Sequence, residues 1–455
     1  MASNVLFILS DEHARDIAGC YGNQIVQTPN IDALAGRGVR FDNAYCNSPI
    51  CVPSRASLAT GNYPHRTGYW DNAHPFDGGV PTWHHHLRDA GHNVVSIGKL
   101  HYRDAGDDAG CSQSLHPIYV PDGQGDVIGL LRKDGQPRKA ASAMAEKAAR
   151  GMSDYAAFDD RVAGAATDWL RARSGGAGKP WVLYVSFVIP HFPLIAPPDF
   201  FALYDDADIP LPDQYGHDER PRHPGIDAYR QSFNYDDYFD EDSLRTALQA
   251  AGLEEDTLVI YASDHGESLG NRGLWGKSVF YDDACAIPMI MAGPGIKAGT
   301  KNSTPCSLVD LYPTILGAAG RRLNAREHKL PGSDLRAFLD RPAPQRAVFS
   351  EYHAAGSTSG GFMLRKGDWK LIYYVGHPPQ LFHLPSDPRE KHDLAGQEST
   401  AEIQAMLETE LRQIVDPEAA DAKAFADQAR RIAALGGEDT IRARSEIGFT
   451  PAPKG

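Results

Sequence analysis

Short, nearly continuous apolar runs recur along the N-terminal part of the chain. Five of them have the length of a strand: Val5–Ser10, Asn93–Gly98, Trp181–Val188, Thr257–Ser263 and Pro288–Ala292. Strands that are buried on both faces read as continuous apolar runs, whereas strands with one exposed face alternate apolar and polar residues. The runs therefore predict a parallel sheet covered by helices on both sides.

Segments with helical periodicity lie between these apolar runs: Pro29–Gly38, Pro81–Ala90, Asp159–Arg173, Ser243–Ala251 and Leu308–Ala319. The first opens with Pro and closes on Gly, which are the residues favoured at those two ends of a helix. Alternation of strands and helices is typical of doubly wound α/β folds. We predict such a fold, with a mostly parallel sheet flanked by helices, for a catalytic domain over residues 1–345.

The pattern changes after about residue 345. Two β-like runs meet at Lys366-Gly367-Asp368, which is a hairpin signal, and Gln380–Leu384 is expected to add a strand. Thr400–Ile414 has the pattern of a helix. We predict a smaller antiparallel α+β subdomain over residues 346–415. For the tail, residues 416–455, we predict a helix and then either an arm that contacts a partner subunit of a homo-oligomer or a partly disordered end.

Composition narrows the function classes. The 455 residues include 45 Lys and Arg against 59 Asp and Glu, a net charge of −14, which disfavours binding to nucleic acid. A local group of cations can still bind an anionic substrate. The first apolar run is too short for a signal peptide or a membrane span, and no basic residue precedes it. We therefore predict a cytoplasmic protein that does not associate with membranes.

Polar residues follow the predicted strands directly. They are Asp11, Lys99, His101, His191, Asp264 and His265. In an open α/β sheet, ligands bind beyond the carboxyl ends of the strands, so these side chains are expected to meet in one crevice. Carboxylate oxygens suit Ca²⁺ or Mn²⁺. A site that also has an imidazole ligand is more favourable for Mn²⁺ or Fe²⁺ than a site with oxygen ligands alone. The strand ends thus predict a metal site that also carries positive charge.

The segment Cys51-Val52-Pro53-Ser54-Arg55, followed by Thr60-Gly61, resembles the signature of type I sulfatases, which are formylglycine-dependent members of the alkaline phosphatase superfamily. Further segments resemble motifs of the same family: Thr28–Asp32, Gly98–His101, Pro190–Pro193, Ser263–Glu267, Gly276–Ser278 and Leu381–Leu394. The resemblance covers residues 4 to 415. Together with Asp71-Asn72-Ala73, its pattern is most similar to choline-sulfatase-like and phosphonate-monoester-hydrolase-like members.

This resemblance implies that the protein hydrolyses sulfate esters. Cys51 would be oxidised by a formylglycine-generating enzyme to Cα-formylglycine, whose hydrated geminal diol attacks sulfur. The other residues that it implies are Arg55 to hold the nucleophile, Lys99 and Lys277 to bind the anion, His191 as general acid, His101 as base and Asn72 as a substrate contact.

The resemblance also implies one divalent cation, Ca²⁺ or Mn²⁺. Its ligands would be Asp11, Cys51, Asp264 and His265, with Glu12 where many members carry a second Asp. Phosphonate monoester and phosphodiester hydrolases use the same nucleophile, metal and lysines, so their activity remains the alternative to sulfate ester hydrolysis.

Two further hypotheses remain at this stage. The segment Gly266–Gly270 has the Gly-x-Ser-x-Gly spacing of an esterase nucleophile elbow, which requires a helix to start at Ser268. The glycine-broken segment that follows disfavours such a helix. The other hypothesis is an anion-binding protein without activity, in which Cys51 is never modified.

Overall fold

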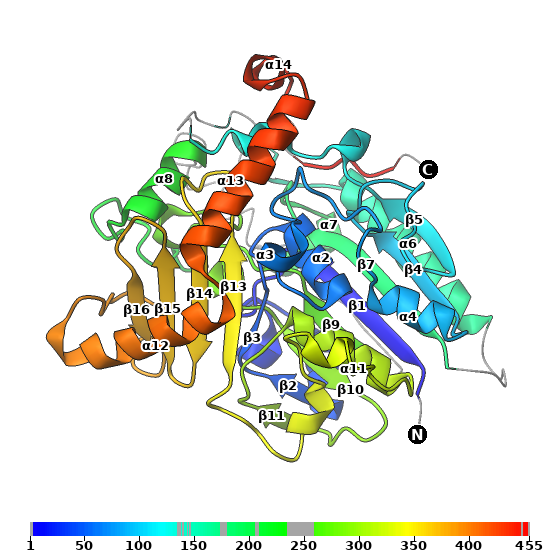
Figure 1. The fold of residues 1–455 in the computed structure, drawn as a ribbon. Coiled ribbons are helices and arrows are strands. Elements are labelled where there is room, and N and C mark those ends of the chain that lie inside the picture. The colour runs from blue at the N-terminus through cyan, green and yellow to red at the C-terminus, as the bar shows by residue number, and fades with distance from the viewer. Residues whose placement is uncertain are drawn as a thin grey trace.

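The structure is a computed structural model that describes residues 3–133, 138, 141–142, 144, 147–172, 180–204, 209–233, 259–446 and 449–453. An eight-stranded sheet forms its centre (Figure 1). In the order in which they lie side by side, its strands are β11 (Thr300–Asn302), β2 (Val39–Phe41), β10 (Met289–Ala292), β9 (Val259–Ser263), β1 (Val5–Asp11), β7 (Val182–Pro190), β4 (Val94–Lys99) and β5 (Gln113–Ile118).

The five predicted strands are present as β1, β4, β7, β9 and β10, and the predicted α/β fold class is confirmed. One strand departs from the predicted direction, because β10 runs antiparallel to both β9 and β2. All four residues of β10 are buried. A strand in this position would be an apolar run in either orientation, so the sequence did not indicate whether it runs parallel or antiparallel to its neighbours. The short strands β2, β5 and β11 have no long apolar run and were not predicted.

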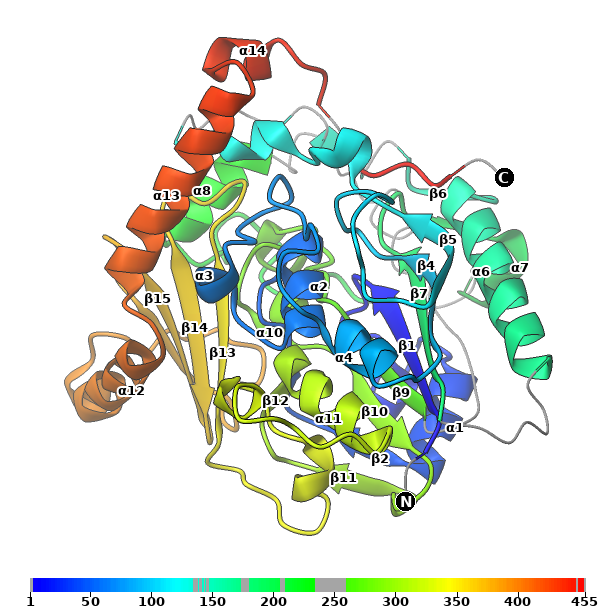
Figure 2. The same cartoon turned by 45° about the vertical axis from the view of Figure 1, so that its right-hand side comes forward.

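Helices cover both faces of the large sheet (Figures 1 and 2). On one face, α1 (Pro29–Arg37) and α6 (Asp154–Arg171) pack against alternate residues of the strands, among them Leu6, Ile97 and Val185. On the other face lie α2 (Cys51–Thr60), α4 (Trp83–Asp89) and α11 (Leu311–Ala318), against residues such as Phe7. The alternation along β1 follows from the two-residue period of a strand.

Four of the five predicted helices correspond to α1, α4, α6 and α11, with their ends shifted. The helix predicted over Ser243–Ala251 lies outside the described residues. The helix α6 begins five residues earlier than predicted because the side chain of Ser153 caps it by accepting a hydrogen bond from the backbone N–H of Ala156. The remaining short elements are α3 (Pro64–Thr67), α7 (Pro198–Phe201), α8 (Pro224–Phe233), α10 (Asp282–Cys285), β3 (Ala44–Tyr45), β6 (Ala149–Arg150), β8 (Ile195–Ala196) and β12 (Cys306–Ser307).

A second, four-stranded antiparallel sheet lies beside the large one (Figure 1). Its strands are β13 (Ala347–Tyr352), β14 (Gly361–Lys366), β15 (Trp369–Tyr374) and β16 (Gln380–His383). The hairpin predicted at Gly367 joins β14 and β15, and α12 (Ala401–Ile414) packs on both of these strands. The smaller antiparallel α+β unit is thereby confirmed.

The tail folds back onto its own chain. Helix α13 (Pro417–Ala434) runs away from the small sheet and leads to α14 (Glu438–Arg442) (Figure 2). Asp427 in α13 accepts a hydrogen bond from the Trp70 indole at 2.7 Å, and Gln428 donates to Asp71 at 2.8 Å. Contact of the tail with a partner subunit stays a prediction. Among the described residues, no helix combines the length and the apolar character that a membrane span requires.

Candidate active site

The N-terminus of α2 brings two of the predicted residues into the centre of the molecule. Cys51 is the first residue of this helix, and Arg55 lies one turn further along the same face. All ten residues of α2 are buried. The first turn of a helix exposes unpaired backbone N–H groups and favours negative charge, so this end suits an anion. Asn72 uses its side-chain oxygen to accept the N–H of Val52 at 3.1 Å.

The carboxyl ends of three strands of the large sheet supply most of the other site residues. Asp11 ends β1, Lys99 ends β4, and Asp264 and His265 follow β9. The order β9-β1-β7-β4 sets these ends side by side. Gly98 is required in β4, because its φ is +96° and a Cβ there would lie 2.1 Å from the Ser186 carbonyl oxygen.

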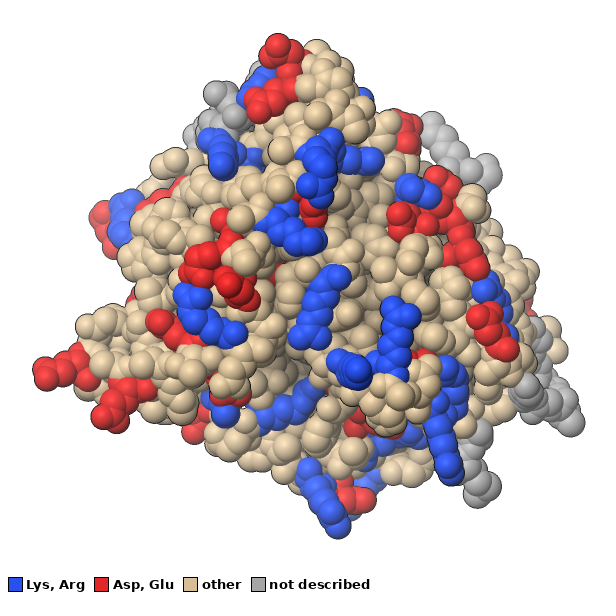
Figure 3. All heavy atoms as spheres, viewed as in Figure 1, with Lys and Arg blue, Asp and Glu red and all other residues tan. Residues whose placement is uncertain are grey.

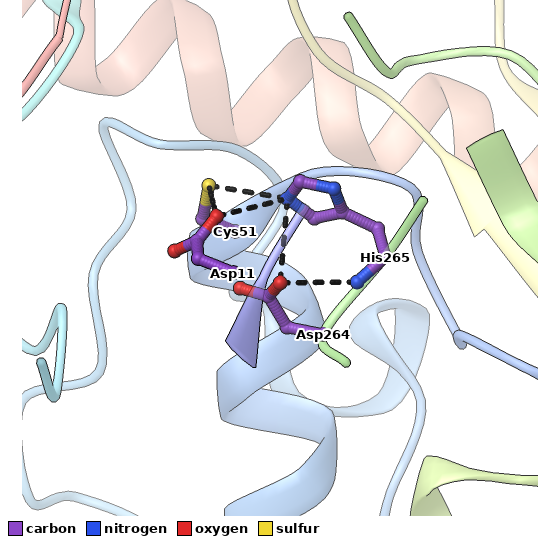
Figure 4. Close-up of side chains that lie close together, drawn as sticks. All are labelled: Asp11, Cys51, Asp264 and His265. Carbon is purple, nitrogen blue, oxygen red and sulfur yellow. Dashed lines mark hydrogen bonds and ion pairs between the residues drawn. The ribbon is translucent and has the colours of Figure 1, made fainter. Parts of the chain in front are cut away.

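Four side chains converge on one point: Asp11, Cys51, Asp264 and His265 (Figure 4). The Cys51 sulfur lies 3.2 Å from His265 Nε2 and 3.6 Å from Asp11 Oδ1. His265 Nε2 lies 3.7 Å from Oδ1 of both aspartates. One ligand atom from each of the four residues lies within 4.8 Å of the other three, and all four residues are buried.

This cluster fits a divalent cation. Donor atoms held at about 2.0–2.6 Å by one ion are spaced as these atoms are. His265 Nδ1 lies 3.0 Å from the Gly266 carbonyl oxygen, which can only accept, so Nδ1 carries the proton. The lone pair of the neutral ring is therefore on Nε2, the nitrogen that faces the cluster, which is the usual arrangement of a metal-bound histidine.

Arg55 organises the two aspartates. Its guanidinium donates to Asp11 Oδ2 at 2.9 Å and to Asp264 Oδ2 at 2.8 Å, so both Oδ1 atoms stay directed at the cluster. The Lys99 ammonium contacts Asp11 Oδ2 at 2.5 Å. Burial raises the pKa of Asp11, but Lys99 and Arg55 outweigh burial and hold that pKa well below its ordinary value. Asp11 is therefore negatively charged at neutral pH.

The cations of the site lie inside the protein. Lys99 and Arg55 are each 1 % exposed and Lys277 is 9 % exposed. On the face drawn in Figure 3, by contrast, acidic and basic side chains are interspersed. The net charge of the chain and its surface thus give no sign of the concentrated positive charge around Cys51.

Glu12 is not one of the four clustered residues but lies next to them, in a second group with Asp11 and His191 whose ligand atoms are within 4.8 Å of one another. Its Oε2 accepts a hydrogen bond from the Lys277 ammonium at 2.7 Å and lies 3.3 Å from His191 Nε2. Burial lowers the pKa of Lys277, but its electrostatic interactions with Cys51, Glu12 and Asp11 outweigh burial and hold that pKa well above its ordinary value. Glu12 is thus placed to orient a charged lysine. The sequence prediction that Glu12 is a metal ligand stays a prediction.

Two histidines flank the cluster. His191 Nδ1 lies 2.7 Å from the Phe192 carbonyl oxygen and so carries a proton, which leaves Nε2 as the reactive nitrogen. Burial and the charge of Lys277 lower the pKa of His191 well below its ordinary value. Burial, Lys99 and Arg55 lower the pKa of His101 in the same way. Both rings are therefore neutral when no anionic ligand is present.

Backbone strain also gathers here. Glu12, His101 and Ser278 have φ values of +67°, +60° and +80°, a region that residues other than glycine rarely occupy. Such conformations persist only where surrounding contacts hold them, and they are concentrated at functional sites.

A cavity of about 110 Å³ opens beside Cys51. Cys51, Asn72, Lys99, His101, His191 and Lys277 all line it. Its outer wall is largely apolar and includes Met144, Phe192, Tyr229, Phe233 and Phe449. The cavity thus joins a polar, cationic base to an apolar wall.

The sequence analysis missed Arg138, Phe449 and Thr450, which also line the cavity. Arg138 forms a two-bond ion pair with Asp126, another lining residue, at 2.7 and 2.8 Å. Each of them lies in an irregular segment without a motif, so no pattern pointed to them.

The esterase elbow predicted as an alternative is not formed. Ser268 lies in a loop, and the next helical turn, Asn271–Gly273, is a short 3₁₀ segment. The Ser268 hydroxyl is buried and has no hydrogen-bond partner within the described part of the chain. A nucleophilic serine needs a general base within hydrogen-bond reach.

Comparison with known proteins agrees with this geometry. A family model described as Sulfatase matches residues 3–321, and one described as N-sulphoglucosamine sulphohydrolase, C-terminal, matches residues 270–416. The choline-sulfatase of Rhizobium meliloti (strain 1021) is 32% identical over 94% of this chain and 90% of its own length. Arylsulfatase K of Rattus norvegicus is 31% identical over 91% of this chain and 78% of its own length.

The solved structures agree in fold. The phosphonate monoester hydrolase of Silicibacter pomeroyi superposes with a TM-score of 0.68 at 24% identity and covers 90% of this chain and 94% of its own.

Proposed function

The chain belongs to the sulfatase family and is a sulfuric ester hydrolase, and we propose that it works through a Cα-formylglycine formed from Cys51 beside one divalent cation. The observation that carries this proposal is the position of Cys51. Its sulfur lies 3.2 Å from His265 Nε2 and 3.6 Å from Asp11 Oδ1, at the N-terminus of a buried helix.

An unmodified cysteine is a poor nucleophile in this setting. Burial and the charge of Asp11 raise the pKa of the Cys51 thiol to about 12, so in the protein without a cation the thiol is protonated at neutral pH. The thiolate, rather than the thiol, is the reactive form of cysteine. A hydrated aldehyde at the same position supplies a hydroxyl instead. Because Cys51 is 1 % exposed, we propose that a formylglycine-generating enzyme acts before the chain folds.

The cation is held by Asp11, the residue at position 51, Asp264 and His265 in this proposal, and we expect Ca²⁺ or Mn²⁺. When bound, it supplies Lewis acidity that makes a hydroxyl nucleophilic at neutral pH. Arg55 orients Oδ1 of both aspartates toward it by binding each Oδ2.

The cations of the protein bind the sulfate group. Lys99 and Lys277 line the cavity on either side of Cys51 and carry point charges that suit the oxygens of a tetrahedral anion. They act in a buried site, where fixed charges stabilise a developing negative charge more than they do in water. Asn72 lines the same cavity and stabilises the first turn of α2 through Val52.

His191 is the proposed general acid for the leaving oxygen. Its Nε2 lies in the cavity, and the negative charge of a bound sulfate ester favours protonation of this nitrogen. Glu12 Oε2 lies 3.3 Å from the same nitrogen and accepts a hydrogen bond from Lys277, and the three groups form the local proton network. His101, which is held neutral, is the proposed base that assists release of sulfate.

The role of His191 predicts a dependence on the leaving group. His191→Ala is expected to lower kcat for an alkyl sulfate by about 10²- to 10³-fold, because a poor leaving group needs its proton. For 4-nitrophenyl sulfate the loss is expected to be about 10-fold or less. Rates over a series of aryl sulfates would measure this as a steeper dependence on leaving-group pKa. His392→Ala, at an exposed histidine, is the matched control, and an equal loss for every ester would contradict the role.

The substrate class is tested by comparing ester types. We expect kcat/KM for 4-nitrophenyl sulfate to exceed that for 4-nitrophenyl phenylphosphonate and for bis(4-nitrophenyl) phosphate. The three esters share one leaving group, so the comparison reports on the transferred group alone. A higher kcat/KM for the phosphonate or the phosphodiester would make hydrolysis of that ester the main activity.

A further inference from the structure

The last described residues of the chain, Phe449–Pro453, form a segment that we call the C-terminal arm. The arm lies at the top of the molecule, next to α6 (Figures 1 and 2). Two residues of α6 hold the arm: the Tyr155 hydroxyl donates to the Thr450 carbonyl oxygen, and Arg161 donates to the Pro453 carbonyl oxygen at 2.9 Å. The arm is therefore anchored at both ends to the helix that covers the catalytic sheet.

The arm reaches the catalytic cavity. Phe449 and Thr450 both line it, although they lie almost four hundred residues after Cys51. The Phe449 ring packs edge-on against Tyr155, with ring centres 5.6 Å apart, and against Phe192, at 6.1 Å. Phe192 in turn stacks on His191 with ring centres 4.4 Å apart. Phe449 thus supports the wall next to the proposed general acid.

Thr450 makes the more specific contact. Its hydroxyl oxygen lies 2.9 Å from Nε2 of His101, the proposed base. His101 is 5 % exposed, its backbone has a φ of +60°, and its Nδ1 is buried without a hydrogen-bond partner within the described residues. Thr450 is therefore the one hydrogen-bonding group that the described chain offers to this ring.

A buried ring in this position needs such a partner. A neutral imidazole carries its proton on one nitrogen and its lone pair on the other, and the hydrogen bond at one nitrogen decides which is which. A hydroxyl that accepts the Nε2 proton leaves the lone pair on Nδ1, where it can take a proton from a reacting group. Without the hydroxyl, the ring can turn about its χ2 torsion and exchange tautomers.

We propose that Thr450 is a positioning residue for His101, and that the C-terminal arm is thereby part of the active site of its own chain. The inference rests on the proposed function for the role of His101, but the contact itself does not. It also gives the tail a use that the sequence pattern did not indicate, since the tail was expected either to contact a partner subunit or to be partly disordered.

The test compares Thr450→Val with Thr450→Ser in the full chain. The valine variant keeps the shape of threonine but has no hydroxyl, whereas the serine variant keeps the hydroxyl. For 4-nitrophenyl sulfate we expect Thr450→Val to lower kcat by about 10- to 100-fold with KM changed by less than about 3-fold. Thr450→Ser is expected to restore kcat to within about 3-fold of the wild-type value.

A second readout separates positioning from a general loss of structure. The imidazolium N–H is a stronger donor than the neutral N–H, so loss of the accepting hydroxyl lowers the pKa of His101. We expect the acid limb of the kcat–pH profile to move to lower pH by about half a unit in Thr450→Val. Thr409→Val, at an exposed threonine of α12, is the matched control and should change neither kcat nor the profile.

The contact can also be tested without turnover. In ¹⁵N spectra of the histidine side chains, with the His101 signals assigned by their loss in His101→Gln, wild-type protein should show one tautomer protonated at Nε2. Thr450→Val should show a mixture. Wild-type kcat, pH profile and tautomer in Thr450→Val would overturn the inference. Absence of sulfatase activity in the wild-type protein would instead overturn the proposed function and leave the tautomer measurement to decide the role of Thr450.

Discussion

Replacing Cys51 with alanine is expected to lower kcat for aryl sulfates by a factor on the order of 10⁴ or more. The reason is that only the residue at position 51 is placed to form a bond to the sulfur of the ester. The other groups of the site only assist the formation of that bond. Arg55, Lys99 and Lys277 bind and orient, and the two histidines move protons, but none of them is placed as a nucleophile. The measurement is kcat with 4-nitrophenyl sulfate for wild type and variant.

Cys111→Ala is the matched control, because Cys111 is a partly buried free cysteine that does not line the cavity. Peptide mass spectrometry of the fragment that holds position 51 completes the experiment. We expect an aldehyde in place of the thiol in active wild-type protein. A fully active protein whose position 51 carries only a thiol would show that formylglycine is not the nucleophile.

Removal of the divalent cation is expected to have the second largest effect. Dialysis against a chelator should lower kcat by about 10³-fold or more, because the nucleophile loses its activation and Asp11 and Asp264 are left facing each other. Return of Ca²⁺ or Mn²⁺ should restore the rate, and the ion that restores it at the lower concentration identifies the preferred metal. Metal analysis of the purified protein should give one ion per chain.

Asp264→Asn should reproduce this loss, since it removes one negative ligand and one partner of Arg55. Asp310→Asn is the matched control: Asp310 is also fully buried and paired with an arginine, Arg346 at 2.6 Å, but it lies outside the cluster. We expect Asp310→Asn to lower the melting temperature while one ion per chain and kcat are retained. Full activity of Asp264→Asn after exhaustive chelation would contradict a metal-dependent mechanism.

Most of the candidate site was predictable because the carboxyl ends of parallel strands lie at the same edge of a sheet. Asp11, Lys99 and Asp264 were identified only as polar residues that follow apolar runs, and the sheet sets their strand ends side by side. The resemblance of the segment from Cys51 to Arg55 added the nucleophile, and a helix then keeps residues four apart on one face. These inferences depend on local pattern and on a rule of topology, so they needed no coordinates.

Other features could not be predicted in this way. Glu12 follows Asp11 directly, and its backbone has a positive φ; its carboxylate contacts Lys277 and His191 and belongs to a second group with Asp11 and His191 rather than to the four-residue cluster. The direction of β10 depends on the path of the loop before it, which an apolar run does not record. The apolar wall of the cavity combines Phe192 and Phe449 from irregular segments with Tyr229 and Phe233 of helix α8, and these segments meet only in the folded chain.

The sequence by itself determined the buried strands, the helices between them and the chemical groups at the strand ends, because burial and periodicity are local properties of a chain. Only the tertiary structure decided which oxygen of each aspartate faces the cluster, which partner Glu12 takes and that Thr450 meets His101. Those contacts join residues that are far apart in the chain, from 44 positions for Arg55 and Asp11 to 349 for His101 and Thr450, and they depend on torsion angles and packing that no local pattern encodes.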